Sequence, residues 1–185
     1  MFKKFLVLVL SILAIFTFSK VAFARTYMKI AVAPKPSPTA TPVLPVDSFA
    51  LFWPMVAGKT MQSKIYFLKI LKEDIRGFFI FGSAQKADYD IFLSIKRTLE
   101  AEALIKGNVP DLANKTIDAA RSDLDKANAK LTDAKNSSDI DQTTKDEINT
   151  RVNNLKLFVT FLENQYPVYK DKLQSIMEKL NSLRT

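Results

Sequence analysis

The stretch "INTRVNNLKLFVTFLENQYPVYKDKLQSIMEKLNSL", residues 148–183, carries apolar residues at alternating spacings of four and three from end to end. This heptad pattern is typical of a helix that buries one stripe against its neighbours. Pro167 lies inside the stretch, where a proline removes a backbone hydrogen bond and clashes with the preceding turn. Because the apolar register continues past Pro167, we predict one long kinked helix or two nearly collinear helices.

Three further helices are expected upstream. Residues 110–134 repeat the four-three spacing, with alanine at every second position of the stripe. Residues 84–107 carry an apolar residue at every fourth position and end at a glycine. No segment shows the alternation of a strand bounded by turn residues, and short connections favour antiparallel neighbours. We therefore predict an all-α fold, a four-helix antiparallel bundle with a long, Pro-kinked C-terminal helix.

The first helix is expected over residues 64–82, "KIYFLKILKEDIRGFFIFG". At about 100° per residue, its large apolar side chains share one arc with the usual width of a core-facing stripe. These side chains are Phe67, Leu68, Leu71, Ile75, Phe78 and Phe79. The many charged residues exclude a transmembrane span, so we expect the arc to lie in the core. Lys69, Lys72 and Arg76 cluster on another side and are candidate contacts for an anionic surface.

The second half of the C-terminal stripe extends beyond the reach of the helix at 110–134. Four of its apolar residues therefore need another cover: Tyr169, Leu173, Ile176 and Leu180. We expect the first two helices of the same chain to provide it. A second copy of the chain is the alternative, in which case these four residues form an interface seam.

The N-terminal sequence indicates export. Lys3 and Lys4 precede an apolar run at residues 5–18, and Ala22-Phe23-Ala24 has the small-x-small form of a cleavage site. We predict a signal peptide over residues 1–24, with an uncleaved membrane anchor as the alternative. The protein is then extracytoplasmic, either secreted or held at the cell membrane.

A linker is expected between the signal peptide and the helices. Residues 25–59 include five prolines between positions 34 and 45, which favour an extended tether over a packed core. We predict that this linker is disordered and that the helical domain covers residues 60–185.

The amino-acid composition excludes most enzyme chemistries. The 185-residue chain contains no cysteine, no histidine and only four glycines. Thiolate and imidazole catalysis, the usual zinc sites and glycine-rich phosphate loops are therefore excluded. The members of carboxylate pairs such as Asp88 and Asp90, or Glu100 and Glu102, are two residues apart and so point to different sides of a helix. We predict no enzymatic activity, no cofactor and no metal.

Two segments resemble a known family. "YFLKILKEDIRGFFIFG" and "QKADYDIFLSIKRTLEAEALIKGN" are similar to the exported bacterial proteins grouped as domain of unknown function 5667. The family's Tyr-x-Leu-Lys opening, acidic residue and paired aromatics are matched by Tyr66, Leu68, Lys69, Glu73, Phe78 and Phe79. Its Lys-Ala pair and later Arg- and Leu-containing run are matched by Lys86, Ala87, Arg97, Leu99, Glu102, Ala103 and Leu104. The likeness spans Tyr66 to Asn108 and implies an exported or envelope-associated helical domain without known catalytic residues.

Two classes of function remain open from the sequence. The first is a structural or protein-interaction module of the cell envelope, which binds another envelope protein or self-associates. The second is a protein that binds a membrane surface or an anionic polymer. The formal net charge is +8, but the charges are well mixed and the chain is expected to be exported, so we expect no nucleic acid partner.

Overall fold

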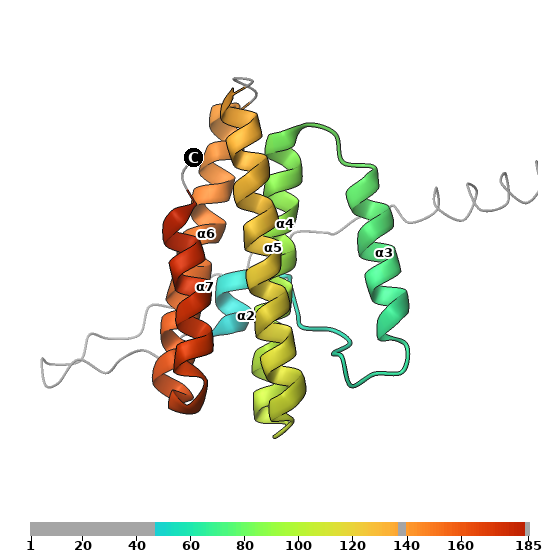
Figure 1. Ribbon diagram of the computed structural model, residues 1–185, viewed down its shortest axis with the longest axis vertical. Coiled ribbons are helices and arrows are strands. Elements are labelled where there is room, and N and C mark those ends of the chain that lie inside the picture. The colour runs from blue at the N-terminus through green and yellow to red at the C-terminus, as the bar shows by residue number, and fades with distance from the viewer. Residues whose placement is uncertain (1–46, 137–139, 184–185) are drawn as a thin grey trace, which may run out of the picture. The chain divides into compact units, whose positions relative to one another are not determined.

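The computed structural model describes residues 47–136 and 140–183, and all regular elements in these ranges are helical (Figure 1). The elements are α2 (Ser48–Phe52), α3 (Tyr66–Phe78), α4 (Ser83–Lys106), α5 (Pro110–Asn136), α6 (Gln142–Gln165), the 3-10 helix η1 (Pro167–Tyr169) and α7 (Lys170–Ser182). The predicted signal peptide and the five prolines between positions 34 and 45 lie outside the described residues. Across the part of the chain described, no helix combines the length and the apolar character that crossing a membrane requires.

Helices α4 to α7 form a four-helix bundle. α5 packs beside α4 and α7, and α6 packs beside the same two helices, so each helix has two neighbours. Consecutive helices run in opposite directions (Figure 1). Their apolar stripes meet in one core, whose largest fully buried side chains include Ile91, Leu124, Leu155 and Phe158. The all-α class is therefore confirmed, with about five main helices in place of the four predicted.

The alanine-rich stripe of α5 is buried as predicted. Ala113, Ala120 and Ala127 are completely buried, as are Ile117 and Leu124 between them. Small side chains let a neighbouring helix approach closely, and the pair of α4 and α5 is the most extensive in the bundle.

The predicted C-terminal helix is instead a helical hairpin. α6 ends before Pro167, and α7 returns alongside it (Figure 1). The physical reason is that a residue before proline is driven out of the helical conformation. Tyr166 accordingly has φ −131° and ψ 71°, and the short η1 turn then reverses the chain. The prediction of one kinked helix or two collinear helices is therefore wrong. The apolar register could not reveal the hairpin, because α6 and α7 bury their stripes in one core and the spacing is the same for either arrangement.

The second half of the C-terminal stripe lies in that core. Leu173, Ile176 and Leu180 are completely buried, and Tyr169 packs partly buried against them. As expected, the cover comes from the same chain, but α5 and α6 supply it instead of the first two predicted helices. The hairpin explains the difference, since it places α7 between these two helices. The candidate interface seam is thus interior in the folded chain.

Residues 47–59, which we assigned to the linker, belong to the same compact unit as the bundle. α2 packs on α6, where the rings of Phe52 and Phe158 meet edge-on with 5.5 Å between centroids. A segment that buries an aromatic side chain gains free energy from being ordered. α2 is thus packed on the bundle within the range that we assigned to the linker.

Helix α3 runs alongside α4 (Figure 1). Its apolar side chains are exposed, opposite to the prediction. The six side chains of the predicted core arc are between 50% and 78% exposed. The inward side carries buried Glu73, with Tyr66 and Lys69 half-buried beside it. The surface of α4 that faces α3 is charged, and an apolar arc placed on Arg97 and Glu100 would deprive these buried groups of their partners on α3 at high cost. Matching charge with charge therefore decides which face of α3 is buried.

Because its side chains are exposed, the apolar arc of α3 should contribute little to stability, whereas a buried arc would contribute much. Phe78→Ala or Leu71→Ala removes atoms that already contact water, so the free energy of unfolding should change by no more than about 0.5 kcal/mol. Leu124→Ala, in the bundle core, should cost about 2–5 kcal/mol because it leaves a cavity. Urea denaturation of the three variants measures these changes. A loss of several kcal/mol for Phe78→Ala would show that the apolar arc is buried after all.

Candidate functional site

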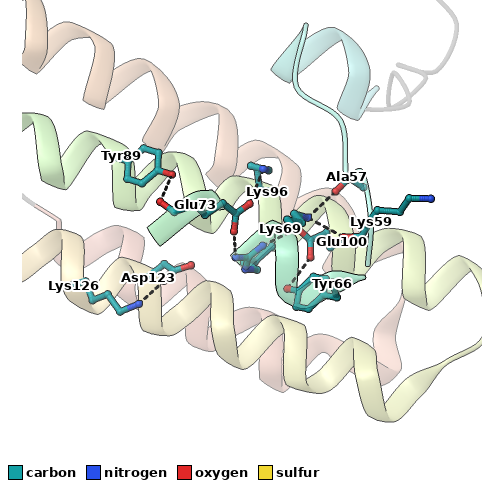
Figure 2. A network of polar contacts seen from close by, with 11 residues as sticks. Ala57, Lys59, Tyr66, Lys69, Glu73, Tyr89, Lys96, Glu100, Asp123 and Lys126 are labelled. Carbon is teal, nitrogen blue, oxygen red and sulfur yellow. Dashed lines mark hydrogen bonds and ion pairs between the residues drawn. The ribbon is translucent and has the colours of Figure 1, made fainter. Parts of the chain in front are cut away.

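The site lies where the inward stripe of α3 meets α4 (Figure 2). On α3, Tyr66, Lys69 and Glu73 recur at spacings of three and four and so share one helix face. On α4, Lys96, Arg97 and Glu100 face them, with Tyr89 two turns before. We call these seven residues the α3–α4 network.

Arg97 is the centre of the α3–α4 network. Its guanidinium group binds the Glu73 carboxylate and donates to Glu100 Oε1 at 2.9 Å. Lys96 Nζ donates to Glu73 Oε1 at 2.7 Å. Each carboxylate therefore contacts more than one cation or donor.

The remaining contacts tie α3 to its surroundings. Lys69 pairs with Glu100 and also donates to the backbone carbonyls of Ala57 and Lys59, at 3.1 and 2.9 Å. Tyr66 donates its hydroxyl proton to Glu100 Oε2 at 3.1 Å. Together these bonds fix both the loop before α3 and the rotation of the helix.

A glycine lets the far end of α3 approach α4. A β carbon on Gly77 would lie 3.3 Å from the Tyr89 ring, closer than ordinary van der Waals contact. The Tyr89 hydroxyl can then donate to the backbone carbonyl oxygen of Glu73 at 2.9 Å. The close approach thus adds a hydrogen bond between the helices that a larger residue at position 77 would disturb.

Burial determines the electrostatics of the network. Glu100, Arg97 and Glu73 are all buried. Burial by itself raises the pKa of Glu73, but hydrogen bonds from Lys96 and Arg97 outweigh it and hold the pKa below its ordinary value. Burial lowers the pKa of Lys69, and its contact with Glu100 offsets only part of that effect. These ions are kept in the interior because each is paired.

The lowered pKa of Glu73 predicts a pH dependence of stability. Its stabilising effect is fully present above the unfolded-state pKa, near 4.5, and is lost as the pH falls through the folded-state value. We expect the free energy of unfolding to fall below pH 4.5, and to fall less in Glu73→Gln. Burial raises the pKa values of Asp88 and Asp123, so their contributions to the free energy of unfolding change with pH in the opposite direction. Both residues are present in the parent and in the variant, so these contributions cancel in the comparison. Parallel pH profiles from urea denaturation would contradict this role for Glu73.

The structure separates the three basic residues proposed from the sequence. Lys69 is committed to Glu100, so it is not a free contact for an anionic surface, and this is a correction. Lys72 and Arg76 are exposed and have no ion pair within the described ranges. The buried residues Leu173 and Ile176 of the predicted seam lie on α7 and take no part in the network.

Most of the network was missed from the sequence. Glu100 was considered only as half of a carboxylate pair, and Arg97 entered only through the family resemblance. A usable signal was present, since Arg97 and Glu100 stand three residues apart on α4 and so share one side of this helix. Two charges within an otherwise buried stripe indicate a partner helix with charges of its own.

The network is suited to holding a helix in place. The Glu73 and Glu100 carboxylates are occupied by donors, and no cluster of three acidic residues that could hold a metal is found in residues 47–136 and 140–183. Because the network holds the charged side of α3 against α4, the apolar side of the helix is left exposed. Eight large apolar side chains are exposed on α3 and at its two ends, and we call them together the outer face of α3: Ile65, Phe67, Leu68, Leu71, Ile75, Phe78, Phe79 and Phe81.

The fold and this surface define a class of all-α domains in which a bundle carries an outward-facing amphipathic helix. A family model described as "Domain of unknown function (DUF5667)" matches residues 60–181, so the chain belongs to that family. The resemblance inferred over Tyr66 to Asn108 is thereby confirmed, and it extends through most of α7. No curated protein and no solved structure matches the chain.

Proposed function

We propose that this domain binds the surface of an anionic lipid bilayer through the outer face of α3. The observation that carries the proposal is the outward orientation of an amphipathic helix whose apolar side has no cover within the described chain. Soluble proteins rarely leave so many large apolar side chains exposed together unless the surface has a binding role.

The composition of α3 matches an interfacial helix. Four phenylalanines and four aliphatic residues form the outer face, while the opposite side is charged. Helices with this division lie in the plane of a bilayer, with the apolar side in the boundary between head groups and acyl chains. A single convex helix suits a flat, fluid surface better than a protein partner, which must supply a groove of matching shape.

The α3–α4 network holds this orientation in place. Because Glu73 and Glu100 are paired beneath α3, a rotation that buried the outer face would separate these ions from their partners. The outer face is therefore presented before any ligand arrives, and a preformed surface binds without an ordering cost.

The charges around α3 support an anionic surface. Lys64 precedes the helix, and the unpaired Lys72 and Arg76 flank the apolar arc. Each basic residue near an anionic leaflet adds about 1 kcal/mol to binding. The expected export and the apolar run at residues 5–18 place the chain close to a membrane on sequence grounds.

Sedimentation with lipid vesicles tests the proposal. The chain should bind vesicles that contain phosphatidylglycerol more strongly than neutral phosphatidylcholine vesicles, and the difference should shrink with salt. The double variant Phe67→Ser/Phe78→Ser should reduce partition about tenfold or more, because each phenylalanine contributes roughly 1.5–3 kcal/mol when buried. The parent chain and its variants keep the same N-terminal segment, so any vesicle binding by the apolar run at residues 5–18 is equal in all of them.

A matched control uses an exposed apolar residue elsewhere. Val168, in η1, is 93% exposed, and Val168→Ser should leave vesicle binding unchanged. Equal partition of the double variant and the control would contradict the proposal. A dimer in solution that the double variant dissociates, without vesicle binding, would instead support the self-association that the sequence allowed.

A further inference from the structure

Two hollows adjoin on the inward side of α3. The first, of about 500 Å³, lies between the segment that follows α2 and helices α4 and α6. The second, of about 410 Å³, lies between residues 56–59 and helices α3 and α4. Val56, Phe92 and Lys96 line both hollows, so the two hollows meet at these residues, and we call them together the cleft. Each hollow is within the size range of small-molecule sites.

The half of the cleft nearest α2 is mostly apolar, although Asn154 and Arg151 also line it. Its walls include Leu51, Phe52, Met55 and Val56 from the α2 segment, with Ile95 from α4. Trp53 lies at the same wall. Such a lining favours a hydrocarbon group over water.

The half nearest α3 is basic. Five cationic side chains line it against one carboxylate, that of Glu73: Lys59, Lys69, Lys72, Arg76 and Lys96. Lys69 and Lys96 are already paired within the α3–α4 network, but Lys59, Lys72 and Arg76 have no ion pair in the part of the chain described. Like charges gathered without a counter-ion repel one another and focus an attractive field on an anion.

Three cations meet where the two halves join. Arg76, Lys96 and Arg151 lie over the Phe92 ring, with their charged groups 5.5, 5.7 and 5.9 Å from its centroid. Arg76 also lies 5.5 Å from the Tyr89 centroid. Contact with two rings orients this guanidinium group and leaves N–H donors for a ligand. The planar fork of an arginine matches phosphate oxygens, two at a time.

We propose that this cleft binds an amphiphile with a phosphate head group, which places the phosphate near Arg76 at Phe92 and the hydrocarbon tail along the α2 segment. The proposal is independent of the outer face of α3, whose side chains do not line the cleft. It rests on the junction of an apolar and a basic hollow, which neither a simple anion nor a neutral hydrocarbon would fill.

The chain contains a single tryptophan, and that residue lines the cleft, so intrinsic fluorescence reports binding. The full chain is titrated with a 1-acyl-glycerol 3-phosphate below its micelle concentration. Two further arms use glycerol 3-phosphate, which has the head alone, and a neutral monoacylglycerol, which has the tail alone. We expect a saturable change in Trp53 emission with the amphiphile and an affinity at least about tenfold weaker for either part.

Matched variants locate the head-group contact. Arg76→Gln breaks no ion pair and should weaken binding of the amphiphile about tenfold or more. Lys115→Gln removes an equally exposed charge on α5, outside the cleft, and should leave the titration unchanged. Phe78→Ser should also leave it unchanged, so that a failure here is distinguished from a failure of vesicle binding.

Three results would overturn the proposal: no saturable change with the amphiphile, unchanged affinity in Arg76→Gln, or equal affinity for glycerol 3-phosphate. The last would identify a free phosphate ester as the ligand. Urea midpoints of the variants confirm that each is folded, and Lys72→Gln gives a second test of the basic half if Arg76→Gln is destabilised.

Discussion

Arg97→Ala is expected to lower the free energy of unfolding by about 3–5 kcal/mol, as removal of one partner from a buried ion pair does elsewhere. The variant leaves Glu73 and Glu100 buried beneath α3 without their shared guanidinium group. Lys96 and Lys69 still contact these carboxylates, but the substitution removes a cationic partner from two buried charges at once, so the effect should be among the largest for any single polar residue.

Urea denaturation of Arg97→Ala and Lys172→Ala makes the comparison. Lys172 pairs with Asp118 at 2.8 Å, but both side chains are about half exposed. Exposed pairs contribute about 0–1 kcal/mol, so this control should unfold nearly as the parent does. Equal effects of the two substitutions would mean that water reaches the α3–α4 network and that charge pairing does not orient α3.

The double variant Leu173→Glu/Ile176→Glu is expected to be unfolded and monomeric. Both side chains are completely buried between α5 and α6, where a carboxylate has no partner. Each substitution adds a cavity or strain term to the cost of burying an unpaired charge. Because the free energy of unfolding of a domain of this size is only about 5–15 kcal/mol, the summed cost of the two substitutions should exceed it.

Circular dichroism and size-exclusion chromatography distinguish the outcomes. Gln174→Glu places a carboxylate on the exposed side of α7 and should leave the helix content unchanged. A Leu173→Glu/Ile176→Glu variant that stays folded while a dimer dissociates would contradict the structure and restore the interface seam.

The sequence was sufficient where one pattern has one physical solution. The four-three stripe of α5 contains alanines, which favour a close contact with a neighbouring helix, and these alanines are buried as predicted. The same spacing across Pro167 has two solutions, a straight helix and a hairpin, because both preserve the register. Only the tertiary contacts of α7 with α5 and α6 distinguish them.

The orientation of α3 required information from another helix. Periodicity located the apolar arc of Phe67 to Phe79 correctly but did not say whether the arc is buried. That outcome depends on Arg97 and Glu100, which make the facing surface of α4 charged. Of the three basic residues expected to contact an anionic surface, Lys72 and Arg76 have no ion pair in the described residues, while Lys69 is paired with Glu100 in the α3–α4 network.

A nitroxide label at position 78 tests the central claim most directly. The chain has no cysteine, so Phe78→Cys creates a unique attachment site. Without vesicles, we predict frequent collisions of the label with a water-soluble paramagnetic reagent, because Phe78 is 78% exposed. With phosphatidylglycerol vesicles, the label should be shielded from that reagent and collide more often with oxygen dissolved in the bilayer. A label already shielded without vesicles, or one that vesicles leave unchanged, would contradict the account of α3 as an outward-facing, membrane-binding helix.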